Sequence, residues 1–304
     1  MKSTALRLLA ACLVLTCFAF ARSNVQGTFE RTYQVSGPAD LQVFTHSGDI
    51  VVHSGPAGSV KVSGKIIVSD RWLNGGKTSE VQELEKNPPV RQDANNIRVD
   101  YVNIRNIAID YEITVPADTK VQTHTGSGDQ TMEGLKSALE LESGSGDIQL
   151  RDLEGPVQLH TGSGDVKGDI AAAFRAETGS GDIRIEERGT GDIDVRTGSG
   201  NIEVRGVNGA LRAQAGSGDL TIEGIQKNNW EVHTGSGNVS LRLPASAAFN
   251  LEARTSSGDV VVDHPVSMTV QGKVQEEHKS VVGTVGGGGP LLSVHTGSGD
   301  IHIE

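Results

Sequence analysis

Val157–Val166, with the sequence VQLHTGSGDV, contains the unit from which most of this chain is built. A Gly-Ser-Gly turn is followed by Asp165, and apolar residues alternate with polar ones on both sides. The residue after the last glycine, here called the corner residue, recurs at Asp49, Asp129, Asp147, Asp165, Asp182, Asn201, Asp219, Asn238, Asp259 and Asp300. From Asp129 to Asn238 the intervals are 18, 18, 17, 19, 18 and 19 residues, then 21, and the last gap of 41 spans about two units. A fixed period of this length indicates a repeat architecture.

Apolar residues occupy fixed positions relative to the corner residue. They stand one and three residues after it and six and eight residues before it, and the positions between them are mostly polar. Phe174 and Trp230 belong to the column eight residues before the corner, so we predict that they lie in the core. This alternation predicts two short strands per unit, one on each side of the Gly-Ser-Gly turn.

Stacking explains how such small units bury their apolar columns, because one unit alone cannot. The sequence therefore predicts an all-β fold, a single-stranded β-solenoid (β-helix-like) with coils of about 18 residues. The alternative treats each Gly-Ser-Gly as a hairpin turn and gives an antiparallel meander or sandwich. Columns of like residues in register favour the solenoid. A second, variable corner in each coil holds glycines and prolines, as at Glu154–Pro156.

Three regions are predicted along the chain: a signal peptide at residues 1–21, an N-terminal β-rich cap at residues 22–117, and the solenoid repeat domain at residues 118–304. The cap would cover the open first coil, whose backbone groups would otherwise lack partners. Leu41–Gly55 of the cap resembles a repeat unit. Three further strands are predicted at Val60–Val68, Ile97–Ile104 and Ile107–Val115, and one short helix is predicted at Thr78–Pro89.

The first residues have the three-part pattern of a secretory signal: Lys2 and Arg7, an apolar run to Phe20, and a small-residue cleavage site ending at Ala21. A lipoprotein box at Leu9–Cys12 is the alternative. The pattern predicts export to the periplasm, cell envelope or extracellular space. Both cysteines leave with the leader, which excludes disulfides and thiolate chemistry from the mature chain. No second apolar run is long enough to span a membrane.

Charge restricts the partners of the mature chain. Loss of Lys2 and Arg7 lowers the net charge from −11 to −13. A surface this acidic repels nucleic acid and anionic lipid, so we expect no nucleic-acid partner.

Three stretches resemble a known family: YEITVPADTKVQTHTGSGD from Tyr111, LRLPASAAFNLEARTSSGDV from Leu241, and GTVGGGGPLLSVHTGSGDI at the end of the chain. They are similar to the bacterial DUF4097 β-strand-repeat proteins, which are labelled "putative adhesins". The resemblance covers about Val35–Glu304. It implies an exported or envelope-associated β-solenoid without an established catalytic site.

The corner residues allow two chemical interpretations. Gly-Asp-rich repeats in β-rolls bind calcium, but there one residue separates glycine from aspartate, whereas here Asp follows Gly directly. Asn201 and Asn238 keep the side-chain oxygen without the charge. This favours a structural turn in which the oxygen accepts backbone N–H groups. Stacked carboxylates would repel by roughly 1 kcal/mol per neighbouring pair, so weak, non-specific divalent cation binding stays an open hypothesis.

An outward column five residues before each corner alternates in sign, with His124, Glu142, His160, Glu177 and Arg196 in successive units. We expect cross-strand pairing there, and a zinc site from His124, Glu142 and His160 is the less favoured interpretation. Catalytic clusters would stand out as local departures from the repeat, and no nucleophile or phosphate-loop motif occurs. We therefore assign no catalytic, metal or cofactor-binding residues and no cofactor.

The function predicted from the sequence is that of a non-enzymatic, exported adhesin or cell-envelope scaffold that binds a protein or glycan. The alternative is a polysaccharide-binding or polysaccharide-acting β-helix protein, because enzymes on parallel β-helices attack polysaccharides with clustered Asp, Lys or Arg. Exposed aromatic residues, on which sugar platforms rely, are few in the mature chain.

Overall fold

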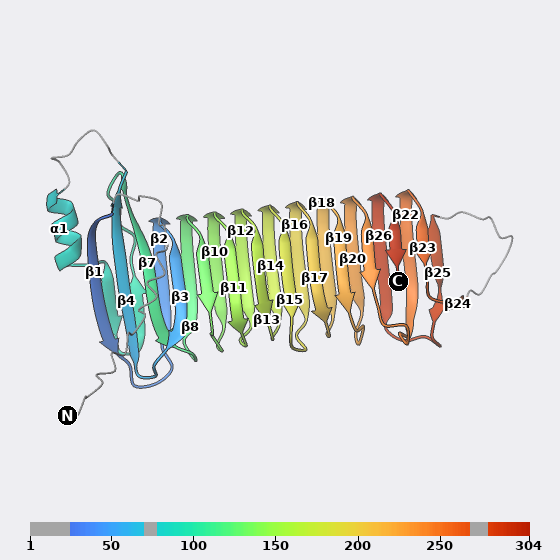
Figure 1. Cartoon of the computed structure of the whole chain (residues 1–304), viewed down its shortest axis with the longest axis horizontal. Helices are drawn as coiled ribbons and strands as arrows, with labels where there is room; N and C mark the ends of the chain where they lie inside the picture. The colour runs from blue at the N-terminus through green and yellow to red at the C-terminus, as the bar shows by residue number, and fades with distance from the viewer. Residues whose placement is uncertain (1–24, 70–77, 268–278) are drawn as a thin grey trace, which may run out of the picture.

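The computed structural model describes residues 25–69, 78–267 and 279–304, so the predicted signal peptide lies outside the described residues. Two long sheets lie face to face along the whole stack (Figure 1). In spatial order, the 13-stranded sheet contains β1 (Val25–Gln34), β4 (Ser59–Val68), β7 (Ile107–Pro116), β3 (Ile50–Gly55), β9 (Gln130–Glu133), β11 (Ile148–Leu153), β13 (Val166–Ile170), β15 (Ile183–Glu187), β17 (Ile202–Val207), β19 (Leu220–Gly224), β21 (Val239–Arg242), β27 (Ile301–Ile303) and β23 (Val260–Val262).

The 14-stranded sheet contains, in spatial order, β24 (Val266–Ser267), β25 (Ser280–Val285), β22 (Phe249–Ser257), β26 (Leu291–Ser298), β20 (Trp230–Ser236), β18 (Leu211–Ser217), β16 (Ile193–Ser199), β14 (Phe174–Ser180), β12 (Val157–Ser163), β10 (Leu139–Ser145), β8 (Lys120–Ser127), β2 (Asp40–Ser47), β6 (Asn96–Val99) and β5 (Val90–Asp93). The all-β prediction is confirmed.

The repeat strands pair in parallel, as stacked coils do, and the meander alternative is wrong for them. Each Gly-Ser-Gly corner joins a strand of one sheet to a strand of the other, as between β12 and β13. From β8 to β20 of the 14-stranded sheet, paired residues are 17 to 19 positions apart, as in Leu139 with Val157. The register therefore places like residues of neighbouring coils side by side.

The core lies between the two sheets and consists of the predicted apolar columns. Phe174 and Trp230 are buried, and the Trp230 indole N–H donates to Gly209 O at 3.0 Å. Opposite them, residues after the corner, such as Ile148 and Ile183, are fully buried. Burying each such side chain contributes roughly 1.5–3 kcal/mol, so the stability of a coil depends on having a neighbour on each side.

The N-terminal region extends the 13-stranded sheet with antiparallel strands. β1 pairs with β4, β4 pairs with β7, and β7 joins the parallel stack through β3. The predicted strand at Ile97–Ile104 is shorter, because β6 ends at Val99. The predicted short helix is present as α1 (Thr78–Lys86), which packs against β1. No measurement tests the predicted domain boundaries, which stay a prediction.

The C-terminal coils are not stacked in chain order. β26 lies between β20 and β22, and β27 lies between β21 and β23, so the last unit is inserted before the Asp259 unit (Figure 1). Within the 41-residue gap, β25 runs antiparallel to β22, and β24 pairs with β25 at that edge of the 14-stranded sheet. The gap is about two units long, as counted from the sequence, but β25 within it is an antiparallel strand and does not belong to a parallel coil.

Candidate functional site

The corner residues form one continuous hydrogen-bonded ladder. In each coil the corner N–H donates to the side-chain Oδ1 of the preceding corner residue, as from Asp165 to Asp147 at 2.8 Å and from Asp219 to Asn201 at 2.9 Å. In spatial order the ladder contains Asp110, Asp49, Asp129, Asp147, Asp165, Asp182, Asn201, Asp219, Asn238, Asp300 and Asp259. The structural interpretation of the Asp or Asn residues is confirmed.

Sequence reasoning missed two parts of this corner. Asp110 begins the ladder from β7, where no Gly-Ser-Gly precedes it. In some coils the buried Thr four residues before the corner forms a second tether. Thr197 and Thr234 donate their hydroxyls to Gly181 O and Gly218 O of the preceding coil, both at 3.0 Å. The recurrence of Thr at this position was the available signal.

Hydrogen bonding and burial shift the ladder's carboxyl groups in opposite directions. The N–H of Asp182, helped by Lys167, lowers the pKa of the Asp165 carboxyl. At the start of the ladder, burial raises the pKa of Asp110 despite the N–H that Asp49 donates. The Asp165 carboxylate therefore acts as a charged acceptor of a backbone N–H group.

Two metal sites were considered from the sequence: divalent cations at the corners, and zinc at His124, Glu142 and His160. The described residues contain no group of three or more His, Cys, Asp or Glu side chains arranged to hold an ion. His124, Glu142 and His160 are neighbours in register, and His124 Nδ1 lies 2.8 Å from Glu142 Oε2, but His160 has no bond to either. The predicted cross-strand neighbours are confirmed, and weak divalent cation binding at the corners stays a prediction.

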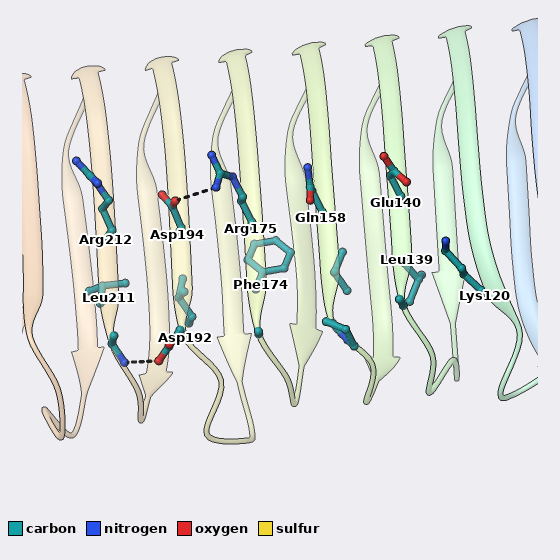
Figure 2. Close-up of a pocket in the computed structure, with 16 residues that line it drawn as sticks. Lys120, Leu139, Glu140, Gln158, Phe174, Arg175, Asp192, Asp194, Leu211 and Arg212 are labelled. Carbon is teal, nitrogen blue, oxygen red and sulfur yellow. Dashed lines mark hydrogen bonds and ion pairs between the residues drawn. The ribbon is translucent and has the colours of Figure 1, made fainter.

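A groove of about 580 Å³ crosses the outer face of the 14-stranded sheet at the starts of neighbouring strands (Figure 2). One side is the small-residue row, nine positions before the corner, which contains Ala138, Pro156, Ala173 and Ala210, interrupted by Asp192. The other side is the charged row, seven positions before the corner, which contains Glu140, Gln158, Arg175, Asp194 and Arg212. Lys120 lies at one end. The hollow exists because short side chains stand beside long ones in register over several coils.

The charges in the groove neutralise one another along the stack. Arg175 Nη1 lies 3.7 Å from Asp194 Oδ2, and Arg196 Nε donates to Asp194 Oδ1 at 3.1 Å. Gln122 donates to Glu140 Oε2 at 3.3 Å, and Asp192 Oδ1 accepts the Ala210 N–H at 2.9 Å. Between the two rows lie residues such as Phe174, which are buried and belong to the core. The groove therefore offers mixed polar contacts beside a row of small residues, and the sequence analysis did not identify it.

The corner opposite Gly-Ser-Gly contains a buried acid. Glu187, at the end of β15, is only 4% exposed, and its Oε2 accepts the Asn208 N–H at 3.1 Å. Burial raises the pKa of this carboxyl, and the N–H groups of Asn208 and Gly191 oppose that effect. Glu187 does not line the groove.

The family model described as Toastrack DUF4097 matches residues 30–172 and 110–304. The chain belongs to the Toastrack DUF4097 family. No curated protein matches it. In the part of the chain that the structure describes, no helix has the length and apolar character needed to cross a bilayer.

Two solved structures are similar over most of this Toastrack chain. A "putative cell adhesion protein" from Clostridium sporogenes is 13% identical, with 91% of this chain and 98% of that chain covered and a TM-score of 0.27. A "putative adhesin" from Bacteroides fragilis is 15% identical, with 92% and 98% covered and a TM-score of 0.39. Identities and TM-scores this low assign no function to this chain.

Proposed function

We propose that this Toastrack protein is a non-enzymatic, exported β-solenoid with coils of about 18 residues, which acts as an adhesin-like interaction module or scaffold at the cell envelope. The groove on the 14-stranded sheet is the single observation that carries the proposal. It runs across successive strands, so a partner lying in it contacts one residue from each of several coils. A rigid, repeating surface of this kind suits an elongated partner.

The groove's chemistry indicates a polar linear polymer, either a glycan or an extended protein segment. Acidic, amide and basic side chains alternate along the charged row, so donors and acceptors are both available and no single charge dominates. The side chains of Arg175 and Arg212 are exposed, although each forms an ion pair with an acidic neighbour. Hydrogen bonding to hydroxyl or amide groups therefore contributes more to recognition here than net charge does.

The bonding of the groove carboxylates supports the non-enzymatic part of the proposal. Glycoside hydrolysis uses two carboxyl groups placed on either side of the scissile bond. Glu140, Asp192 and Asp194 each accept a hydrogen bond from the protein itself. The bonds to Glu140 and Asp192 come from neighbouring coils, and the bond to Asp194 comes from Arg196 on its own strand.

Binding and turnover can be tested together. A glycan array and a pull-down from envelope fractions would detect the partner, and a reducing-sugar assay would detect cleavage. We expect binding without turnover, and Arg175→Ala with Arg212→Ala should abolish the binding. Arg205→Ala on β17 is the matched control, because Arg205 is a comparably exposed, ion-paired arginine on the other sheet. Sugar release by the wild type, or equal loss of binding in the control, would overturn the proposal.

Export is tested separately. Mass spectrometry of the protein from periplasmic, envelope and culture fractions should find an N-terminus at Arg22, after cleavage at Ala21. An intact leader on protein that stays in the cytoplasm would contradict the export proposal and leave the groove experiment unaffected.

A further inference from the structure

Two histidines from distant parts of the sequence stack against each other on the outer face of the 14-stranded sheet. His233 on β20 and His295 on β26 are register partners. Their rings lie 5.1 Å apart between centroids and are nearly parallel, with an interplanar angle of 2°. Both side chains are exposed. The pair exists because the last unit is inserted beside β20, since stacking in chain order would place Arg254 next to His233.

The two rings have no acidic partner in the described part of the chain. His124 and His302, by contrast, lie 2.8 Å from Glu142 and 3.1 Å from Asp263. Gln214 is the neighbour of His233 on β18, and Arg254 is the neighbour of His295 on β22. The acid nearest in sequence on that face, Glu231, accepts a hydrogen bond from Arg212. The imidazole nitrogens of the pair are therefore free to take a ligand from solvent.

We propose that His233 and His295 chelate a transition-metal dication of the Cu²⁺, Ni²⁺ or Zn²⁺ class, with water completing the coordination shell. Neutral imidazole is a preferred ligand for these ions, with metal–nitrogen distances near 2.0–2.1 Å. Two rings about 5 Å apart reach one ion by turning toward each other about χ2, a torsion with a broad energy minimum for histidine. Exposure leaves room for this movement.

The donor set predicts selectivity. The ordinary affinity order places Cu²⁺ above Ni²⁺ and Zn²⁺, whereas Ca²⁺ and Mg²⁺ prefer oxygen ligands and should not bind the pair. This separates the histidine site from any calcium binding at the corner carboxylates. A bound ion would also connect β26 to β20, so it should raise the melting temperature by stabilising the folded state alone.

The experiment uses the untagged mature chain and calorimetric titration with each metal, supported by Cu²⁺ electron paramagnetic resonance. We expect one high-affinity Cu²⁺ per chain with nitrogen ligands. His233→Gln and His295→Gln should each weaken it by roughly a hundredfold, because the second imidazole acts at high effective concentration. His160→Gln is the matched control, since His160 lies in the same outward column without a histidine neighbour.

Circular dichroism melting confirms that each variant is folded, which exposed outward side chains should allow. Unchanged affinity in either variant of the pair, or an equal loss in His160→Gln, would overturn the proposal. Calcium binding that survives in the double variant would belong to the corners and would not support the histidine site.

Discussion

At the Gly-Ser-Gly corner, consecutive coils are joined by the same Asx hydrogen bond, whereas at the opposite corner the links change from coil to coil. The opposite corners comprise residues 134–138, 154–156, 171–173, 188–192, 208–210 and 225–229. Their connections include Lys136 with Glu154 at 2.9 Å, Asp192 with the Ala210 N–H, and Glu187 with the Asn208 N–H. The hydrogen bond that is the same in every coil holds the coils in register. The groove lies beside the opposite corner, whose contacts differ between coils.

The largest effect should come from filling a glycine of the uniform corner. Gly146 has φ +137°, and a Cβ there would collide with the carbonyl oxygen of Gly128 on the preceding coil. Gly146→Ala should cost roughly 3–5 kcal/mol of unfolding free energy, because backbone strain and overpacking add. Urea unfolding followed by circular dichroism measures it. Exposed Ser145→Ala is the control and should change little.

Removing one rung of the ladder should have a moderate effect. Asp147 Oδ1 accepts the Asp165 N–H at 2.8 Å, and Asp147→Ala should cost about 1–2 kcal/mol by leaving that donor without its partner. Asp147→Asn keeps the acceptor oxygen, as Asn201 does for Asp219, and should stay within about 0.5 kcal/mol of the wild type. Equal losses in both variants would mean that the charge, and not the acceptor, holds the corner.

The features that recur in every unit could be predicted from the sequence, and the features that depend on contacts between distant segments could not. The strands, the core columns and the role of the corner residues could be predicted because each unit repeats the same local chemistry. The insertion of β26 beside β20 could not, since Val294 and Val232 are far apart in the chain and nothing local specifies their pairing. Asp110 was missed for the same reason.

The sequence contains the row of small residues that borders the groove, but this row alone does not predict a groove. Ala138, Pro156, Ala173 and Ala210 share one position in the register, but small residues there predict a hollow only once that position is known to face outward beside longer side chains. The chemical identity of a partner depends on surfaces assembled from several coils, so residue spacing alone does not give it.

A pH-dependent effect should distinguish the opposite corner. Burial raises the pKa of Glu187, so the folded state holds its proton more tightly than the unfolded state does. Its contribution to stability is present below the ordinary pKa of 4.5 and is lost as the pH rises through the raised value. Glu187→Gln should therefore melt higher than the wild type at neutral pH and close to it in acid.

The melting temperatures of the wild type and Glu187→Gln should be compared from acid to neutral pH. Glu186→Gln is the control, because Glu186 is the adjacent exposed residue. Asp165 should show the opposite sign. Its pKa is lowered, so its contribution is present above the ordinary pKa and is lost as the pH falls through the lowered value. A Glu187→Gln gain that is the same at every pH would contradict the titration of a buried acid.

The smallest stability effect should come from the charged row of the groove. Arg175 is exposed and lies 3.7 Å from Asp194, and exposed ion pairs contribute roughly 0–1 kcal/mol. Arg175→Ala should therefore leave the urea midpoint nearly unchanged while weakening partner binding. If it instead destabilises the chain as much as Asp147→Ala does, the charged row serves stacking, and the contrast between the uniform corner and the groove disappears.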